Sequence, residues 1–223
     1  MHRNLSALMI FVYICHMRTL LTIMAVATTV LLGACTHHKK AGTIITPDAI
    51  AACHEGDILL RQGTGTTSHI VTAADGNTPY SHCAIVATDS SGTLVAVHAV
   101  PGEPDDNGRT DCVKAEPIRE FYSEIRATRG CILRYADAET AHKAACEAMR
   151  LAIAHTPFDH DYDCTDTTTL YCTQLVELCY ARHGATIAPM PRHNFCLPTT
   201  KFKEVRLPGD FARSPRLQCI VQF

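Results

Sequence analysis

A cysteine at the start of an apolar helix is the residue in this chain best placed for covalent chemistry. Cys172 lies in the segment Leu170–Val176, and apolar residues recur after it at helical spacing, which predicts a helix with one face in the core. A hydroxyl from Thr167–Thr169 is expected to cap this helix, and Gly184 to end it. The positive end of the helix dipole favours a thiolate over a thiol. A cysteine on a helix is more often a small buried hydrophobe, so the position alone leaves both roles open.

Two histidines on neighbouring predicted strands could supply the base that a cysteine nucleophile needs. His82 opens an apolar run over 81–87, and His98 lies near the end of Thr93–Val100. A turn at Asp89–Gly92 joins the two runs into a hairpin, and side chains on one face of adjacent antiparallel strands lie about 5 Å apart. We therefore expect His82 and His98 to be neighbours, although each alone is more often an ordinary core or surface residue.

The remaining segments predict an α+β domain in which helices pack on an antiparallel sheet. Further strands are expected at 56–61, 113–115, 131–135 and 216–223, and helices at 117–123 and from Asp137 to about His155. The apolar face of the longer helix consists of Ala145, Ala148, Met149 and Ala152. Residues 63–77 and 101–111 are rich in turn-forming residues, so both are expected to be loops.

The N-terminal segment predicts an export signal that ends in a lipid-modified cysteine. Arg18 precedes the apolar run Leu20–Leu32, and Leu32-Gly33-Ala34-Cys35 matches a bacterial lipobox. The apolar run is shorter than the roughly 20 residues of a membrane-spanning helix. We expect residues 1–35 to be a lipoprotein signal peptide, with Met17 as an alternative start, and Cys35 to carry the lipid that anchors the protein to a membrane.

Length and composition fit a single domain behind that signal. The chain has 223 residues, of which 47% are hydrophobic and 19% charged, with a formal net charge of −2, as is typical of a globular domain. We expect a polar tether over 36–46 and one domain over 47–223. The charge is near neutral and no basic stripe is present, so a nucleic-acid partner is not expected.

The many cysteines and histidines follow no recognisable metal-binding motif. The chain contains 12 cysteines and 13 histidines, but no CxxC or HExxH pattern. We therefore expect no metal site and no cofactor. An envelope location permits disulfide bonds, but the cysteine spacing does not indicate any particular pairing.

The order of four motifs resembles the circularly permuted papain-fold branch of the NlpC superfamily, the YiiX/YaeF-like group. The motifs are Gly56-Asp57-Ile58-Leu59, Ser81-His82-Cys83-Ala84-Ile85-Val86, the strand ending in His98, and Tyr171-Cys172-Thr173-Gln174-Leu175-Val176. Ordinary papain-like enzymes place the cysteine before the histidine, whereas here His82 precedes Cys172, as permutation requires. The resemblance runs from about Gly56 to Cys219 and implies a permuted papain-like fold with the nucleophile at a helix N-terminus.

The same resemblance implies a role for each candidate catalytic residue. Cys172 would be the nucleophile, and His82 the general base and then the general acid. The third residue, on the next strand, is commonly glutamate in bacterial relatives and is His98 here; the related lecithin retinol acyltransferase group also uses a second histidine. Glu103 is the alternative orienting residue, if its loop folds back onto the site.

Two further residues, Tyr171 and Asp57, are expected to shape the site. The backbone N–H of Cys172 is the expected oxyanion donor, because the first N–H groups of a helix have no partner within it. Neither Tyr171 nor Asp57 is supported by a spacing argument.

The function that this resemblance implies is that of a cysteine hydrolase, a peptidase or amidase that works through a thioester on Cys172. For a lipoprotein facing the periplasm, on the outer rather than the inner membrane, murein stem peptides are the leading expected substrate. Two alternatives remain: a lipid-directed acyltransferase or amidase of the same fold, and a non-catalytic, lipid-anchored binding module. The polar character of residues 63–77 argues against an apolar lid and so against the lipid-directed alternative.

Overall fold

The computed structural model describes residues 41–223, apart from 77, 106 and 197–200. The expected signal peptide over 1–35, its Cys35, and residues 36–40 of the expected tether lie outside the described part. Within the described part, no helix combines the length and the apolar character that crossing a bilayer requires.

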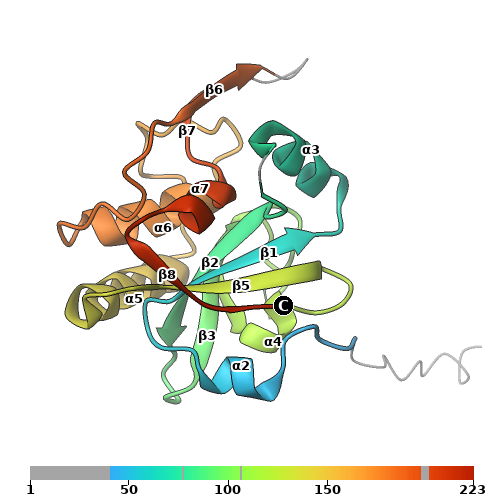
Figure 1. Cartoon of the computed structure of the whole chain (residues 1–223), viewed down its shortest axis with the longest axis vertical. Coiled ribbons are helices and arrows are strands. Elements are labelled where there is room, and N and C mark those ends of the chain that lie inside the picture. Colours follow the sequence, from blue (N-terminus) through green and yellow to red (C-terminus); the bar gives the residue numbers. More distant parts are fainter. Residues whose placement is uncertain (1–40, 77, 106, 197–200) are drawn as a thin grey trace, which may run out of the picture. The chain divides into compact units, whose positions relative to one another are not determined.

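A six-stranded antiparallel sheet forms the centre of the domain, with strand order β4-β3-β2-β1-β5-β8 (Figure 1). Its strands are β1 (Ile58–Gly63), β2 (His82–Thr88), β3 (Leu94–Val100), β4 (Cys112–Pro117), β5 (Ala127–Tyr135) and β8 (Leu217–Gln222). Every adjacent pair in this sheet is antiparallel. The predicted α+β class and each of the expected strands are confirmed.

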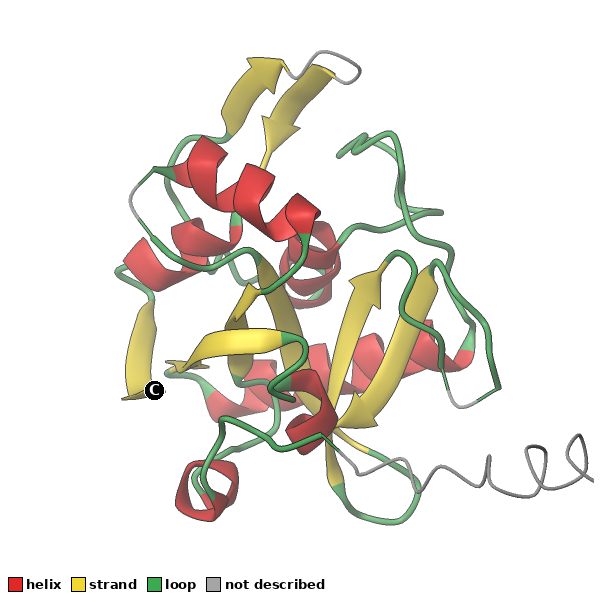
Figure 2. Ribbon diagram, turned by 90° about the vertical axis from the view of Figure 1, so that its right-hand side faces the viewer, coloured by secondary structure: helices red, strands yellow, loops and turns green. Residues whose placement is uncertain are grey.

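Helices cover both faces of the sheet (Figures 1 and 2). Helices α5 (Ala138–Ile153) and α6 (Cys172–Ala181) pack on one face, and α2 (Pro47–Ala51) and α4 (Ile118–Phe121) belong to the core on the other. Because neighbouring side chains of a strand point to opposite faces, the residues of β2 divide between the two cores. The first core takes Cys83, Ile85 and Ala87.

Helix α5 matches its prediction closely. The side chain of Asp137 accepts a hydrogen bond from the backbone N–H of Glu139 and so caps the helix. Ala145 and Ala148 are fully buried against the sheet. Small side chains at these positions let the helix backbone approach the strands closely, which brings α5 and α6 together over β2.

The segment 63–77, expected to be a loop, contains the helix α3 (Thr66–Asp75). Threonines lower helix propensity only slightly, and contacts with other elements decide the outcome here. Asp75, in the last turn, forms an ion pair with Arg213 at 2.6 Å. Gly76 then ends the helix in the left-handed conformation, with φ of 66°. The loop prediction for 101–111 is confirmed for its described residues, which form neither helix nor strand.

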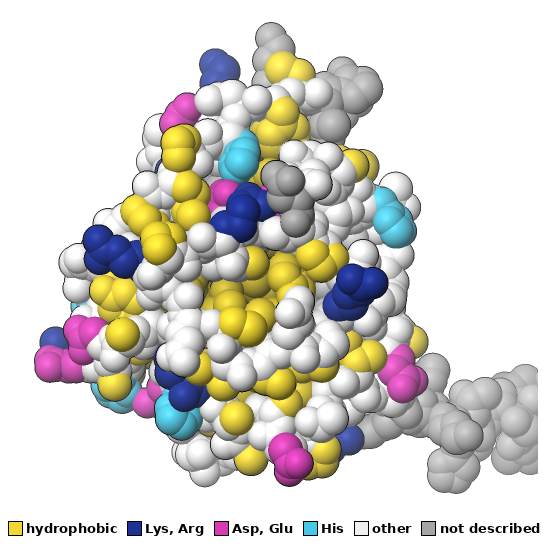
Figure 3. All heavy atoms as spheres, in the orientation of Figure 1, with side chains coloured by type: hydrophobic (Ala, Val, Ile, Leu, Met, Phe, Trp, Pro, Cys, Tyr) yellow, Lys and Arg dark blue, Asp and Glu magenta, His cyan; other side chains and the backbone are white. Residues whose placement is uncertain are grey.

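Three further elements near the C-terminus were not expected from the sequence. A hairpin of β6 (His193–Cys196) and β7 (Lys201–Val205) precedes the short helix α7 (Pro208–Arg213). The hairpin projects from the end of the domain that also carries α3 (Figures 1 and 2). On the face seen in Figure 3, hydrophobic side chains gather at the centre and charged side chains lie nearer the rim.

Candidate active site

Cys172 is the first residue of α6, and the residue before it, Tyr171, is the N-cap. The prediction of a threonine cap was wrong. Thr168 and Thr169 instead donate their hydroxyl hydrogens to the carboxylate of Asp166 in the preceding turn. The helix therefore begins at the cysteine itself, which leaves the backbone N–H of Cys172 without a partner inside the helix.

The first turn of α6 is held in place by two side chains next to Cys172. The side-chain oxygen of Gln174 accepts a hydrogen bond from the backbone N–H of Tyr171 at 3.4 Å. Its side-chain nitrogen donates one to the backbone carbonyl of Asp166 at 2.6 Å. The hydroxyl of Thr173 donates to the carbonyl of Arg206 at 2.8 Å. These bonds connect the helix start to the loop before it and to the chain that precedes α7, so the thiol and the free N–H share a fixed orientation.

His82 and His98 are direct neighbours, as their predicted strands required. Nε2 of His82 lies 2.8 Å from Nδ1 of His98, and both side chains are buried. The ring of Phe121 in α4 packs against both imidazoles, with centroid distances of 5.7 and 5.3 Å. With Nε2 of His82 engaged by His98, its Nδ1 is the nitrogen left to serve the thiol.

The surroundings of Cys172 favour its thiolate. The largest cause is a hydrogen bond from the thiol of Cys83, followed by the hydrogen bond and the charge of His82, and together these outweigh burial and hold the pKa of Cys172 well below its ordinary value. Burial next to that sulfur raises the pKa of Cys83 well above the ordinary value. The two shifts have opposite signs, and both favour a Cys172 thiolate beside a protonated Cys83. Nothing in the sequence pattern sets Cys83 apart from the other cysteines.

Glu116 stands behind His98 and completes a line of polar groups. Its Oε1 lies 3.1 Å from Nε2 of His98. Burial alone would raise the pKa of Glu116, but His98, Lys114 and Arg126 outweigh burial and hold that pKa well below its usual range. Burial lowers the pKa of His98 to about 4, against the attraction of Glu116. At neutral pH, a neutral His98 thus lies between His82 and a carboxylate.

Glu116 was not predicted as a site residue, because the strand predicted over 113–115 ends one residue before it. In the structure, β4 runs to Pro117, and Lys114 lies directly opposite His98 in the register with β3. Glu116 follows Lys114 by two residues and therefore shares its face of the sheet. Extending the period-2 pattern from 113–115 would have revealed it.

Glu103, the alternative orienting residue, does fold back towards the site but is engaged elsewhere. Its Oε1 lies 2.6 Å from the guanidinium of Arg61, and its Oε2 lies 3.4 Å from that of Arg126. Burial would raise the pKa of Glu103, but Arg61 and the two histidines outweigh it and lower the pKa. The structure thus gives the position behind His98 to Glu116 and pairs Glu103 with arginines.

Asp57 lies outside the site that it was expected to shape. It stands just before β1, whose other end, at Arg61, pairs with His82. Its carboxylate contacts Nε and one terminal nitrogen of Arg134, each at 2.7 Å. The aspartate of this motif therefore joins β1 to β5, far along the strand from the nucleophile. Tyr171, in contrast, lies beside Cys172 in the lining of the cavity described next.

A cavity of about 500 Å³ opens onto Cys172 and His82. Its walls include residues of α3, the loop before α6, and the β6–β7 hairpin. Aromatic rings form a continuous set along one wall, namely Phe158, Tyr162, Tyr171, Phe195 and Phe202. The hydroxyl of Tyr171 is buried without a hydrogen-bond partner among the described residues. The volume lies in the range typical of small-molecule sites.

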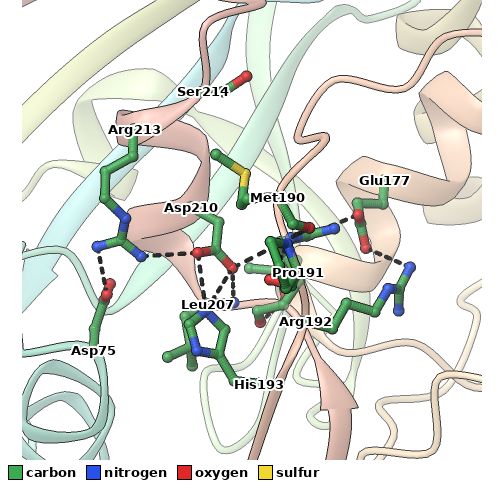
Figure 4. Close-up of polar contacts among 12 residues, drawn as sticks. Asp75, Glu177, Met190, Pro191, Arg192, His193, Leu207, Asp210, Arg213 and Ser214 are labelled. Carbon is green, nitrogen blue, oxygen red and sulfur yellow. Dashed lines mark hydrogen bonds and ion pairs between the residues drawn. The ribbon is translucent and has the colours of Figure 1, made fainter.

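A network of ion pairs fixes α3 and α7 at the cavity (Figure 4). Asp75 of α3 contacts Arg213 of α7 at 2.6 Å, and Arg213 contacts Asp210 at 2.8 Å. Asp210 also lies 2.9 Å from Nε2 of His193 in β6. No space remains for a Cβ at Gly209, because it would overlap the carboxylate of Asp75. These contacts hold α3, β6 and α7, which are far apart in sequence, together beside the cavity.

His98, Glu103 and Glu116 are the one group of three or more candidate metal ligands in the described residues whose ligand atoms lie close together, within 4.8 Å. This group does not fit a metal cation. Lys114 lies 3.0 Å from Glu116, and Arg126 lies 2.8 Å from it, while Glu103 is paired with Arg61. Both carboxylates are already neutralised, so a cation would be repelled by the charges around them.

Comparison with solved structures gives the same fold. A crystal structure described as metalloprotein YiiX from Escherichia coli O157:H7 is similar to this chain, with a TM-score of 0.59 and 16% identity. The match covers 76% of this chain and 97% of the other. No curated protein matches the chain.

A family model gives a more specific result. The model describes permuted papain-like amidase enzymes of the YaeF/YiiX type, the C92 family, and it matches residues 52–221. The match spans the sheet, both helices on its first face and all the residues of the candidate site. The expected permuted papain-like fold and the YiiX-like relationship are therefore confirmed: this chain belongs to the permuted papain-like amidases of the YaeF/YiiX, C92 family.

Proposed function

We propose that this protein hydrolyses amide bonds with Cys172 as nucleophile, His82 as general base and acid, and His98 and Glu116 as the groups that orient His82. The family is one of papain-like amidases, which supports the reaction class. The observation that carries the residue assignment is the close approach of His82 to His98 at 2.8 Å and of His98 to Glu116 at 3.1 Å, beside a cavity that Cys172 and His82 both line.

In the first half of the reaction, His82 holds the proton of the Cys172 thiol while the sulfur attacks the carbonyl carbon of the amide. The carbonyl oxygen gains negative charge, and the free backbone N–H of Cys172 can donate to it. His82 then transfers its proton to the leaving amine as the C–N bond breaks. The acyl group remains on Cys172 as a thioester.

In the second half, water hydrolyses the thioester. His82 takes a proton from the water as its oxygen attacks the carbonyl carbon, and the C–S bond breaks to release the carboxylic acid and the thiolate. Throughout, Nδ1 of His98 accepts a hydrogen bond from the Nε2–H of His82. Nε2 of His98 faces the carboxylate of Glu116. A neutral histidine alone supplies no opposite charge to the His82 imidazolium, and the Glu116 carboxylate supplies it from one residue further away.

The substrate that follows from the predicted location is a murein stem peptide. The lipobox at Cys35 predicts a lipid anchor in the bacterial envelope, facing the periplasm from the outer membrane. An amidase so placed would meet murein peptides first. Recovery of the wild type with membranes, and of Cys35→Ser in the soluble fraction, would support this location; identical fractionation of both would contradict it.

A second candidate substrate, an amide that carries a long apolar acyl group, is favoured by the cavity wall. Besides the aromatic set, Ile70 and Val71 of α3 and Ile125 line the cavity. The lining arginines are each paired with a carboxylate, as Arg61 is with Glu103, so none requires an anionic substrate. Residues 63–77 are therefore not too polar to cover an apolar chain, because their helix α3 contributes Ile70 and Val71 to the cavity lining.

One experiment tests the reaction and separates the two substrates. The purified protein is offered a murein stem tripeptide and an N-acyl amino acid amide with a long chain, beside a Cys172→Ala variant. We expect release of amine from one or both substrates, and a mass increase on Cys172 equal to the acyl group when the reaction is quenched early. Release that persists in Cys172→Ala would contradict the mechanism. Binding without turnover would instead favour the binding module.

A further inference from the structure

A second cluster of a cysteine, a histidine and a glutamate lies on the surface of α5, apart from the cavity at Cys172. Sγ of Cys146 lies 3.7 Å from Nε2 of His142, one helical turn earlier. Nδ1 of His142 lies 2.6 Å from Oε2 of Glu55, which precedes β1. Both Cys146 and His142 are exposed to solvent. No step of the amidase mechanism uses these residues.

The glutamate fixes the tautomer of His142. A carboxylate accepts hydrogen bonds only, so Nδ1 of the ring carries the proton and Nε2 presents its lone pair towards Cys146. Glu55 is itself held by a hydrogen bond from Thr88 at the end of β2, in addition to its contact with His142. The ring orientation is thus set by two elements outside α5. Carboxylate support at the far nitrogen is the usual arrangement behind histidines that bind metals.

This arrangement lacks what a second hydrolytic site would need. Cys146 lies in the middle of α5, which spans Ala138–Ile153, so its backbone N–H is used within the helix. No free helix N–H is available to an oxyanion at this position, in contrast to Cys172. Nucleophilic hydrolysis is therefore not the chemistry that the cluster favours.

Metal chelation needs no oxyanion donor, and the distances fit it. A tetrahedral Zn²⁺ with ordinary bond lengths to sulfur and nitrogen holds the two ligand atoms about 3.6 Å apart. The observed Sγ to Nε2 distance is 3.7 Å. A hollow of about 300 Å³ beside Cys146 is also lined by Met149, whose thioether is a soft donor. Arg150, in the same lining, is paired with Glu147 at 2.7 Å.

We propose that His142 and Cys146 form a surface site for a borderline-soft metal ion such as Zn²⁺, with Glu55 orienting the histidine. The thiol loses its proton to solvent when the metal binds, and Nε2 supplies the second ligand. Two protein ligands leave positions open to water or to the donor atom of another molecule. The site is independent of the amidase reaction and of its substrate.

The test measures alkylation of Cys146 in the full-length protein, read for each cysteine separately by peptide mass spectrometry. Zn²⁺ alone is the probe, and a chelator reverses it. We expect Zn²⁺ to slow alkylation of Cys146 at least tenfold and to leave exposed Cys196 unaffected. His142→Ala should abolish this protection, and Glu55→Gln should weaken Zn²⁺ binding by roughly tenfold. His69→Ala, a change at an exposed histidine of α3, should retain it.

Two results would overturn the proposal. One is an alkylation rate of Cys146 that Zn²⁺ does not change in the wild type. The other is protection that survives in His142→Ala, which would place the metal elsewhere. If removal of His142 slows alkylation in metal-free protein while Zn²⁺ has no effect, the cluster is a reactive thiol and the metal site is rejected.

Discussion

Cys83 is the residue whose contribution to the nucleophile is most directly testable. Its buried thiol donates to the Cys172 thiolate and is the largest cause of the lowered pKa of Cys172. In Cys83→Ala this donor is lost, so the pKa of Cys172 should rise, and the acid limb of the activity profile should move to higher pH. Cys83→Ser retains an O–H donor and should retain most of the shift. Equal profiles for all three proteins would remove Cys83 from the account.

Glu116 contributes to both orientation and stability. Glu116→Gln removes the charge that faces His98 and leaves Lys114 buried with one carboxylate fewer. We expect kcat to fall by one to two orders of magnitude, comparable to the loss of a supporting carboxylate elsewhere, with little change in KM. The free energy of unfolding should fall by about 3–5 kcal/mol, as for other broken buried pairs.

The matched control is Glu120→Gln, which changes an exposed glutamate of the neighbouring helix α4. Steady-state kinetics and urea unfolding of both variants separate the two effects. A Glu116→Gln protein of lower stability and unchanged kcat would make Glu116 a structural residue only, and His98 would then orient His82 unaided.

At the scale of elements, α3 is the part of the cavity wall whose helical structure is least expected from its own sequence, which predicts a loop. Gly209 of α7 lies against Asp75 with no space for a Cβ. In Gly209→Ala the Asp75 carboxylate must move, which disturbs its ion pair with Arg213, so α3 should be held less firmly at the cavity. We expect KM to rise several-fold, with alkylation of Cys172 by a small reagent unchanged. Ala73→Ser is the control, because Ala73 is an exposed residue of α3 outside the cavity lining. Identical KM values would show that substrate does not contact α3.

Elements with a clear local pattern could be predicted, and those that depend on distant contacts could not. The hairpin of β2 and β3 has alternating buried residues and a polar turn, and α5 has a capping aspartate and an alanine face. In contrast, α3 depends on the Asp75–Arg213 ion pair, which joins residues far apart in sequence. The β6–β7 hairpin has a polar pattern that resembles a loop. Local propensity carries no information about such contacts.

The candidate site likewise contains some residues that could be predicted from the sequence and others that could not. His82, His98 and Cys172 stand in recognisable motifs, and their placement followed from strand pairing and a helix start. Glu116 was missed because the predicted strand ended at residue 115, and Cys83 because its contact with Cys172 depends on the packing of α6 on β2. Asp57 belongs to a motif, but its position at the far end of β1 became visible only in the register of the sheet.

At the scale of the whole molecule, the buried polar line should make stability depend on pH. His98 is fully buried, and its pKa is lowered from 6.5 to about 4. The unfolded chain therefore binds a proton at a pH where the folded protein does not, so stability is lost as pH falls from about 6.5 towards 4. Between pH 6.5 and 5 the loss attributable to His98 is about 1.6 kcal/mol.

Urea unfolding across this range measures that dependence. His98→Gln should flatten the curve, because glutamine does not titrate, although its stability at pH 7 is lower. His69→Gln, at an exposed histidine, should retain the wild-type slope. A His98→Gln slope equal to that of the wild type would contradict a neutral, buried His98.

The central claim is that Cys172 is a nucleophile whose pKa is lowered by its neighbours, His82 among them, and the pH dependence of Cys172 alkylation tests it most directly. Wild type and His82→Ala are compared with a small alkylating reagent, and labelling is read at Cys172 by mass spectrometry. The account predicts rapid labelling of the wild type well below pH 8.5, the ordinary pKa of a free thiol, and a shift of the profile to higher pH in His82→Ala. Slow labelling of both proteins throughout this range would contradict the claim and make Cys172 a structural thiol.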